Sequence, residues 1–308
     1  MYARYALGRL LGLVPTFLAI VTAAFFLMRA APGGPFDQEQ ALPPEIRANL
    51  EAAYGLDRPV WQQYLGYLGN LARGDLGPSF RLKDHSVSEL IASGAPVTFA
   101  VGTAALLLAL ALGVPLGLLA ATRHNRATDH AVMGLALAGI AVPNFVLAPV
   151  LALVAGVWLG WLPVAGWEGG DPRYMVLPVV TLALPFVAYV ARLARGSLLE
   201  VLQAPWIRTA RAKGIDERGV LLRHALKPAL LPVVSFLGPA AAGLLTGSLV
   251  VEQAFGLPGI GRYFVQGAVN RDYTLVMGMV VFYAGMILLL TLLVDLAYGW
   301  LDPRIRHD

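Results

Sequence analysis

Residues 97–121, VTFAVGTAALLLALALGVPLGLLAA, decide the fold class. These 25 residues include no charged side chain. Because an α-helix rises about 1.5 Å per residue, the stretch is long enough to cross a hydrocarbon core about 30 Å thick. Of the 308 residues in the chain, 57% are hydrophobic and 14% are charged, against roughly 25% charged in soluble domains. This composition excludes a soluble enzyme and a disordered chain, and it predicts a membrane protein.

Similar apolar stretches recur along the chain and predict an all-α protein with six membrane-spanning helices. The predicted spans are Leu10–Met28, Val97–Ala121, Ala131–Leu159, Tyr174–Ala191, Ala229–Val251 and Leu275–Leu301. The first is longer than the apolar core of a signal peptide, which is about 7–15 residues, so we expect an uncleaved anchor. Asp295 is the one charged residue within these spans. It is either a structural partner for a neighbouring helix or a substrate contact.

The distribution of Lys and Arg predicts the orientation of the spans, because cytoplasmic loops are enriched in these residues. If the N-terminus is cytoplasmic, the inner segments (1–9, 122–130, 192–228 and 302–308) hold 14 basic residues in 62. The two short outer loops (161–174 and 252–274) hold 3 in 37. We therefore expect both termini in the cytoplasm. The net charge of +4 follows from this asymmetry and does not indicate nucleic-acid binding.

Three regions follow from this topology. Residues 1–29 form the first helix, residues 30–96 an extracytoplasmic helical segment, and residues 97–308 a core of five spans. Within the outer segment, Pro43 and Pro44 begin one short helix and Pro59 begins a second. The second helix places apolar residues on one face, namely Trp61, Tyr64, Leu65 and Leu68. This segment is either a small cap on the span ends or a docking face for an external partner.

The cytoplasmic loop 192–228 is strongly basic but also carries apolar residues at helical spacing. Pro205 breaks the preceding helix, and Gly214 suits the left-handed conformation that ends a short helix. Asp216 is placed to cap the next helix, with Ile215 at the tip of the resulting elbow. The residues alone leave two alternatives open. The loop is either an amphipathic segment resting on anionic lipid or an elbow that docks on a partner protein.

The same loop carries a family resemblance. Thr209–Asp216 (TARAKGID) and Leu221–Pro228 (LLRHALKP) resemble the cytoplasmic loop of ABC-importer permeases, and more narrowly the dipeptide, oligopeptide and nickel branch. Other segments that resemble this branch are YGLDRP from Tyr54, GDLG from Gly74, AVPNF from Ala141, VEQAF from Val251, PGIGR from Pro258 and LDPRIR from Leu301. Arg208, Thr209 and Ala210 stand where the broader permease pattern has Glu-Ala-Ala. The resemblance covers nearly the whole chain in order.

The resemblance implies a type I ABC-importer permease in a bacterial or archaeal inner membrane. Its implied partners are a second homologous permease, two cytoplasmic ATPases, an extracytoplasmic binding protein, membrane lipid and a peptide substrate. It also implies that the elbow couples transport to the ATPases. The residues assigned to this coupling are Thr209, Ala210, Arg211, Lys213, Gly214, Ile215, Asp216 and Arg218. Nickel chelates, glutathione and oligosaccharides are alternative cargoes within the same family.

No catalytic role is expected for this chain. None of its three lysines follows a glycine, so it lacks the Gly-Lys-Ser/Thr of a P-loop, and ATP and Mg²⁺ would be bound by the partner ATPases. A zinc-protease His-Glu-x-x-His motif is absent from the sequence, and no metal site is predicted. An ion-coupled secondary transporter is the rival class. It usually shows paired ionisable groups at the membrane midplane and internal repeats, and neither is evident here.

Two short stretches are candidates for the translocation pathway or its gate. Pro143, with Asn144 and Phe145 after it, can kink the third span, either for packing or to line the pathway. Glu252 lies at the predicted outer end of the fifth span, and Phe255, Pro258 and Gly259 follow it. This second stretch folds back as part of an outer gate, or else it is a plain turn.

Overall fold

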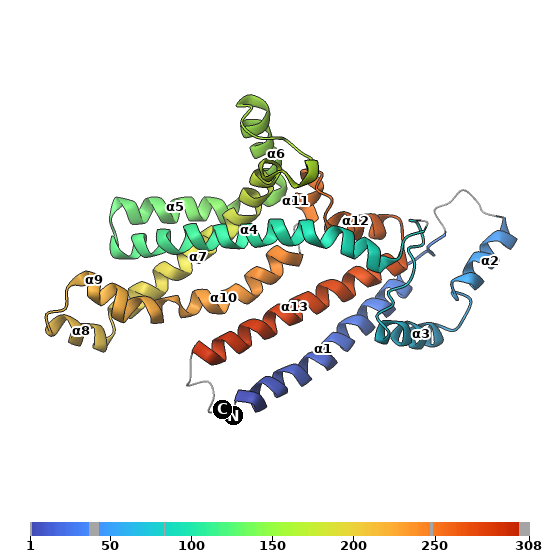
Figure 1. Ribbon diagram of the computed structural model, residues 1–308, viewed down its shortest axis with the longest axis horizontal. Coiled ribbons are helices and arrows are strands. Elements are labelled where there is room, and N and C mark those ends of the chain that lie inside the picture. Colours follow the sequence, from blue (N-terminus) through green and yellow to red (C-terminus); the bar gives the residue numbers. More distant parts are fainter. Residues whose placement is uncertain (1, 37–42, 83, 247–248, 302–308) are drawn as a thin grey trace. The chain divides into compact units, whose positions relative to one another are not determined.

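The computed structural model describes residues 2–36, 43–82, 84–246 and 249–301 (Figure 1). Helices dominate these residues, and the one β-feature among them is an isolated bridge between Pro78 and Ser86. Five helices are long and apolar enough to cross a membrane. A bent pair of helices makes a sixth span if the pair is counted as one. The predicted all-α membrane fold is therefore confirmed.

The chain forms two compact units, one mainly of Ala3–Val97 and Pro258–Leu288 and the other mainly of Thr98–Leu257 and Leu289–Asp308. The first unit contains α1 (Tyr2–Ala30), α2 (Pro44–Ala53), α3 (Val60–Ala72), the start of α4 (Val87–Thr122), α12 (Ile260–Val269) and the first half of α13 (Tyr273–Leu301). The second contains the rest of α4, then α5 (Ala127–Ala141), α6 (Asn144–Leu151), η1 (Ala152–Trp158), η2 (Glu168–Gly170), α7 (Pro172–Leu202), α8 (Pro205–Ala212), α9 (Glu217–Gly219), η3 (Val220–Ala225), α10 (Leu226–Thr246) and α11 (Leu249–Ala254).

In the first unit, α3 packs against α1 through aromatic and aliphatic side chains. Tyr64 and Leu68 lie on a core formed by Val21, Phe25 and Met277. The Tyr64 hydroxyl also shares a hydrogen bond of 2.6 Å with that of Thr22. Trp61 and Leu65, which the sequence placed on the same face, are 60% and 57% exposed. The predicted apolar face of α3 is thus only half covered by the described residues.

Local signals in the sequence set the ends of two long helices in this unit. Ser86 and Glu89 form a capping box at the start of α4, each side chain accepting from the other residue's backbone N–H. Asp272 is fully buried before α13 and accepts from the backbone N–H groups of Arg81 and Leu275. It also accepts from the Ser79 hydroxyl. These bonds join residues 79–81 to the first turn of α13.

Small residues bring the helices of the second unit close together. A Cβ atom at Gly117 of α4 would clash with the backbone carbonyl oxygen of Ala191 in α7. A Cβ at Gly113, one turn earlier, would lie 2.8 Å from the Val190 side chain. Such approaches drive helix association in membranes, where contact between apolar helices brings little hydrophobic gain. The Gly-x-x-x-Gly spacing in α4 therefore has a packing function.

We expect Gly117→Leu to destabilise the protein, because the backbones of α4 and α7 must separate to admit the side chain. Overpacking of this kind costs about 1–3 kcal/mol. The matched control is Gly134→Leu, since a Cβ at Gly134 meets nothing within 4 Å. Both variants would be compared by thermal unfolding in detergent. Equal stabilities would contradict the close packing of α4 on α7.

Several predicted spans differ from the observed helices, and the second already begins at Val87 rather than at Val97. The third is broken between α5 and the helical stretch Asn144–Trp158, which are bent by 103°, because Pro143 forces Val142 into extended backbone. The fourth continues to Leu202, well beyond Ala191, despite Pro178 and Pro185 within α7. Residues of α7 around these prolines are buried. Membrane helices tolerate proline where neighbouring helices pack against them. The fifth starts at Glu217 rather than Ala229, with the π-helical turn η3 inside it.

Candidate functional site

The elbow, residues 205–219, consists of α8, a turn at Gly214 and α9. Gly214 has φ +78, so the turn uses the left-handed conformation that the sequence predicted. Asp216 stands at the N-cap position of α9 with extended backbone (φ −63, ψ 154). Its side chain makes no capping hydrogen bond among the described residues, so only the position of the predicted cap is observed.

The inner face of the elbow is apolar and buried. Ile207 and Ala210 of α8 pack with Val220 and with Leu198 of α7. Ile215, expected at the tip, is instead partly buried against this core. Its side chain points toward this core because burial of its apolar surface is favourable.

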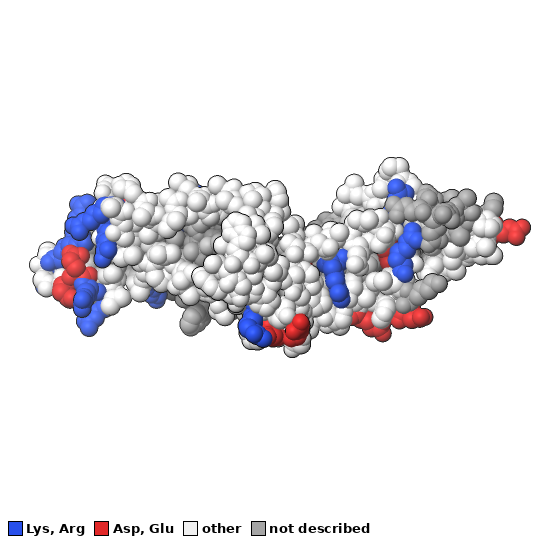
Figure 2. Space-filling view, turned by 90° about the horizontal axis from the view of Figure 1, so that it is seen from above, with Lys and Arg blue, Asp and Glu red and all other residues white. Residues whose placement is uncertain are grey.

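The outer face of the elbow is polar and exposed. Of the residues assigned to coupling, Thr209, Arg211, Lys213, Gly214, Asp216 and Arg218 are exposed. A Cβ atom at Gly214 would meet nothing within 4 Å. Figure 2 shows Lys and Arg side chains gathered at the end of the second unit that carries α8 and α9. The elbow therefore presents a basic surface with a bare backbone turn at its tip.

One of these cations stabilises the elbow itself. The Arg211 guanidinium donates from Nε to Glu217 Oε1 at 2.8 Å and from a terminal nitrogen to Glu217 Oε2 at 3.2 Å. A further bond of 3.4 Å reaches the carbonyl oxygen of Leu202 at the end of α7. Arg211 thus joins α7, α8 and α9. Lys213 and Arg218 remain the more suitable groups for pairing with another protein.

A buried ion pair lies between the N-terminal end of α5 and the C-terminal half of α7. Asp129 is 1% exposed and accepts two hydrogen bonds from the Arg195 guanidinium, at 2.6 and 2.8 Å. The backbone N–H of Asn125 donates to the same carboxylate at 3.0 Å, and His124 lies 3.3 Å away. Every oxygen of the carboxylate is therefore satisfied, as a buried charge requires. No pattern in the sequence indicated this pair.

Five of the seven predicted pathway residues lie on adjoining elements of the second unit, namely Pro143, Asn144, Phe145, Glu252 and Phe255. The helix α6, which begins at Asn144, packs against α7 and α11. The Asn144 side-chain oxygen is buried and has no hydrogen-bond partner among the described residues, whereas Phe145 is 64% exposed. Pro143 occupies the N-cap position at the break in the third span. The predicted kink is therefore observed at Pro143.

Glu252 of α11 is 1% exposed and accepts a hydrogen bond of 2.7 Å from the Thr98 hydroxyl of α4. Phe255 is also buried, and its carbonyl oxygen accepts from the Gly166 backbone N–H at 2.9 Å. The structure thus adds Thr98 and Gly166 to the pathway candidates. Neither partner was identifiable from sequence, because each lies far along the chain from the residue that it contacts.

Pro258 and Gly259 belong to the first unit, where Gly259 is the N-cap residue of α12. A Cβ atom on Gly94 of α4 would lie 2.9 Å from the carbonyl carbon of Gly259, so the two segments are tightly packed. Residues 255–259 form a short connection between α11 and α12.

Comparison with known proteins decides the family. Residues 113–307 match the family described as binding-protein-dependent transport system inner membrane component. The chain belongs to this family. The elbow and all the pathway candidates except Thr98 lie within the matched region. Residues 302–308, which carry most of the LDPRIR motif, fall outside the described structure.

Full-length relatives extend the match across residues 30–96. The oligopeptide transport system permease protein OppB of Escherichia coli (strain K12) is 50% identical over 304 residues, covering 99% of each chain. The dipeptide transport system permease protein DppB of Bacillus subtilis is 43% identical, covering 99% of this chain and 98% of the relative. The resemblance seen in the sequence motifs is therefore confirmed.

Solved structures agree on the fold. A chain of the MetNI methionine ABC transporter in an inward-facing conformation superposes with a TM-score of 0.59 at 19% identity. The match covers 69% of this chain and 96% of that one. A chain of an amino acid ABC transporter gives a TM-score of 0.54 at 19% identity, covering 69% and 94%. This family member therefore has the type I ABC-importer permease fold. About a third of its residues lie outside the match to the MetNI chain.

Proposed function

We propose that this chain is the permease subunit of a peptide-importing ABC transporter and forms half of the translocation pathway with a second, homologous permease. The observation that carries the proposal is the 50% identity to OppB along 99% of both chains. The similarity to DppB extends the same substrate class to shorter peptides. Nickel chelates, glutathione and oligosaccharides are the competing cargoes, and an uptake competition assay separates them.

The elbow is proposed to dock on a cytoplasmic ATPase. Gly214 leaves the backbone uncovered at the turn, so a partner surface can approach it closely. Lys213 and Arg218 are exposed beside it and would pair with acidic groups on the partner. ATP and Mg²⁺ would be bound by two such ATPases, and their closure would shift this chain between inward-facing and outward-facing states. An extracytoplasmic binding protein would deliver the peptide.

The pathway is proposed to run past α6 and α11. Ionisable groups inside a membrane protein are costly, and they commonly mark substrate routes. Glu252, held by Thr98, is such a group within the second unit. A carboxylate there suits the ammonium group of a peptide. Phe255, three residues later, is also buried and would supply an apolar surface in the same stretch of chain.

Affinity purification of the tagged chain from its native membrane tests this function. We expect two P-loop ATPases and a second six-span permease to co-purify, and peptide with its binding protein to raise ATP hydrolysis severalfold. Recovery of the chain alone, with uptake insensitive to ATP depletion, would indicate an ion-coupled secondary transporter instead. Stimulation by a nickel chelate or a sugar, but not by peptides, would retain the importer and reject the peptide cargo.

A further inference from the structure

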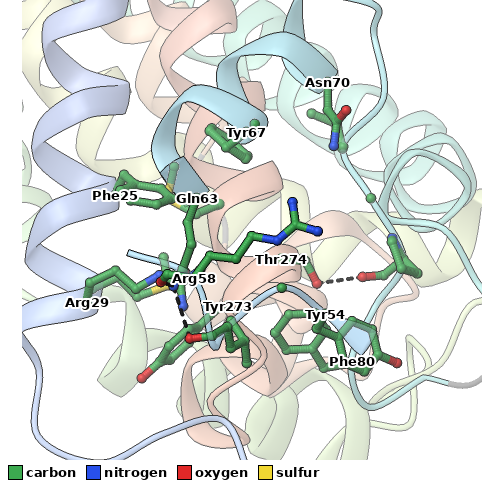
Figure 3. Close-up of a pocket in the computed structure, with 18 of the residues that line it drawn as sticks. Phe25, Arg29, Tyr54, Arg58, Gln63, Tyr67, Asn70, Phe80, Tyr273 and Thr274 are labelled. Atoms are coloured by element: carbon green, nitrogen blue, oxygen red, sulfur yellow. Dashed lines mark hydrogen bonds between the residues drawn. The ribbon is translucent and has the colours of Figure 1, made fainter. Parts of the chain in front are cut away.

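A cavity of about 390 Å³ lies in the first unit, lined by α1, α2, α3, the loop 75–80 and the start of α13 (Figure 3). We call it the cap cavity. Its volume falls within the range of small-molecule sites, about 300–1,000 Å³. Aromatic rings form much of its wall. They are Phe25, Tyr54, Tyr67, Phe80 and Tyr273.

These rings support one another and give the cavity a defined shape. The centroids of Tyr54 and Phe80 are 4.5 Å apart, and those of Phe25 and Tyr67 are 5.8 Å apart. The Tyr273 hydroxyl donates to the Gly33 carbonyl oxygen at 2.7 Å, which fixes that ring. Aromatic pairs at such distances contribute about 0.5–1.5 kcal/mol beyond burial. The apolar walls are therefore preformed.

Two α3 side chains of the cavity lining, Gln63 and Tyr67, each carry a polar atom without a hydrogen-bond partner among the described residues. The Gln63 amide nitrogen donates to the carbonyl oxygens of Leu56 and Arg58, at 3.1 and 2.7 Å. Because carbonyl oxygens only accept, these bonds fix the orientation of the amide and leave its oxygen as an acceptor. That oxygen and the Tyr67 hydroxyl are both buried, with no hydrogen-bond partner among the described residues. Burying such groups unpaired costs about 1–3 kcal/mol each, so a ligand that pairs them gains affinity.

Positive charge exceeds negative charge around the cavity. The lining includes the guanidinium groups of Arg29 and Arg58 and one carboxylate, that of Asp75. The Asp75 carboxylate already accepts from the Gly77 backbone N–H at 2.8 Å. Arg29 lies over the rings of Phe25 and Tyr273, at 5.2 and 5.1 Å from their centroids. Burial raises the pKa of Tyr67 to about 12, so its hydroxyl keeps the proton it would donate to an anion.

We propose that the cap cavity binds a short peptide, with its carboxylate beside Arg58 and the Tyr67 hydroxyl, a backbone N–H donated to the Gln63 oxygen, and an apolar side chain among the aromatic rings. This site would use none of the pathway residues of the second unit. The inference rests on the proposed peptide-importing function and gives the outer segment a role in holding cargo. Peptides match the cavity because they combine an anion, N–H donors and apolar side chains in one small molecule.

Photo-cross-linking tests the site in the purified complex in lipid nanodiscs, without the binding protein. The probe is the dipeptide alanyl-benzoylphenylalanine, and mass spectrometry locates the labelled residues. We expect labelling of residues 54–80, reduced about fivefold by Tyr67→Phe, which removes one hydrogen bond, and about tenfold by Arg58→Gln. Arg73→Gln is the matched control, because Arg73 is exposed in the same segment but does not line the cavity. The C-terminal amide of the probe should label weakly and be insensitive to Arg58→Gln.

Neither Tyr67→Phe nor Arg58→Gln is expected to destabilise the fold. The Tyr67 hydroxyl has no hydrogen-bond partner among the described residues, and Arg58 is exposed. Unchanged labelling in both variants, or labelling confined to residues 98–257, would overturn the cap site even if peptide uptake is normal. Absence of labelling throughout would overturn it as well. Cap labelling that follows the expected pattern, in a complex that transports a different cargo, would support the site and reject the proposed function.

Discussion

Gly214→Trp is expected to abolish peptide uptake while ATP hydrolysis by the partner ATPases continues. The glycine lies at the exposed turn of the elbow with φ +78, and its surroundings are open. A side chain at positive φ costs about 1–2 kcal/mol, which a folded membrane protein tolerates. A tryptophan at the tip would prevent close approach of a partner surface. We therefore expect uptake to fall at least tenfold with normal abundance in the membrane.

The matched control is Gly214→Asn, because asparagine tolerates the left-handed conformation and adds a small side chain. Its uptake should stay within about twofold of the unsubstituted protein, as an intact turn predicts. Uptake and ATP hydrolysis would be measured on the same proteoliposomes. Normal uptake by the Trp variant would eliminate the elbow as the coupling element, and equal loss in both variants would assign the defect to the turn itself.

Features that depend on local sequence were predictable. Length and apolarity identified the membrane helices, and Pro143 and Gly214 marked a break and a turn at the observed positions. Helix ends inside the basic loop were not predictable in the same way. The helix α7 continues to Leu202 through polar residues because its inner face stays buried, as at Ala194 and Leu198. Tertiary packing therefore overrides the hydropathy boundary.

Contacts between residues that lie far apart along the chain could not be predicted from one sequence. Glu252 was identifiable because an acidic residue at the end of an apolar stretch is unusual, yet its partner Thr98 is 154 positions away. The cap cavity likewise combines residues from α1, α2, α3 and α13. Composition predicts that such residues need partners, and only the fold decides which residues those are.

Arg195→Met is expected to destabilise the protein by about 1–3 kcal/mol, because it removes both charge-assisted hydrogen bonds from the Asp129 carboxylate. Asp129 is 1% exposed and receives two hydrogen bonds from the guanidinium. The partners that remain are the uncharged Asn125 N–H and His124, which lies 3.3 Å away and is half exposed, so neither replaces the two guanidinium bonds. Denaturation by SDS in mixed micelles would measure the loss, which should exceed that of any single surface charge.

The double variant Asp129→Asn with Arg195→Met should recover part of this stability, since neither ion then remains unpaired. The introduced amide would retain an oxygen for the Asn125 N–H, so the first turn of α5 keeps its contact. Arg173→Met is the matched control: Arg173 pairs with Asp171 at 2.7 Å, but its side chain is 73% exposed. Exposed pairs contribute about 0–1 kcal/mol. A comparable loss for Arg173→Met and Arg195→Met would mean that burial is not what makes the Asp129 pair important. A double variant less stable than Arg195→Met would show that shape, rather than charge, dominates at this site.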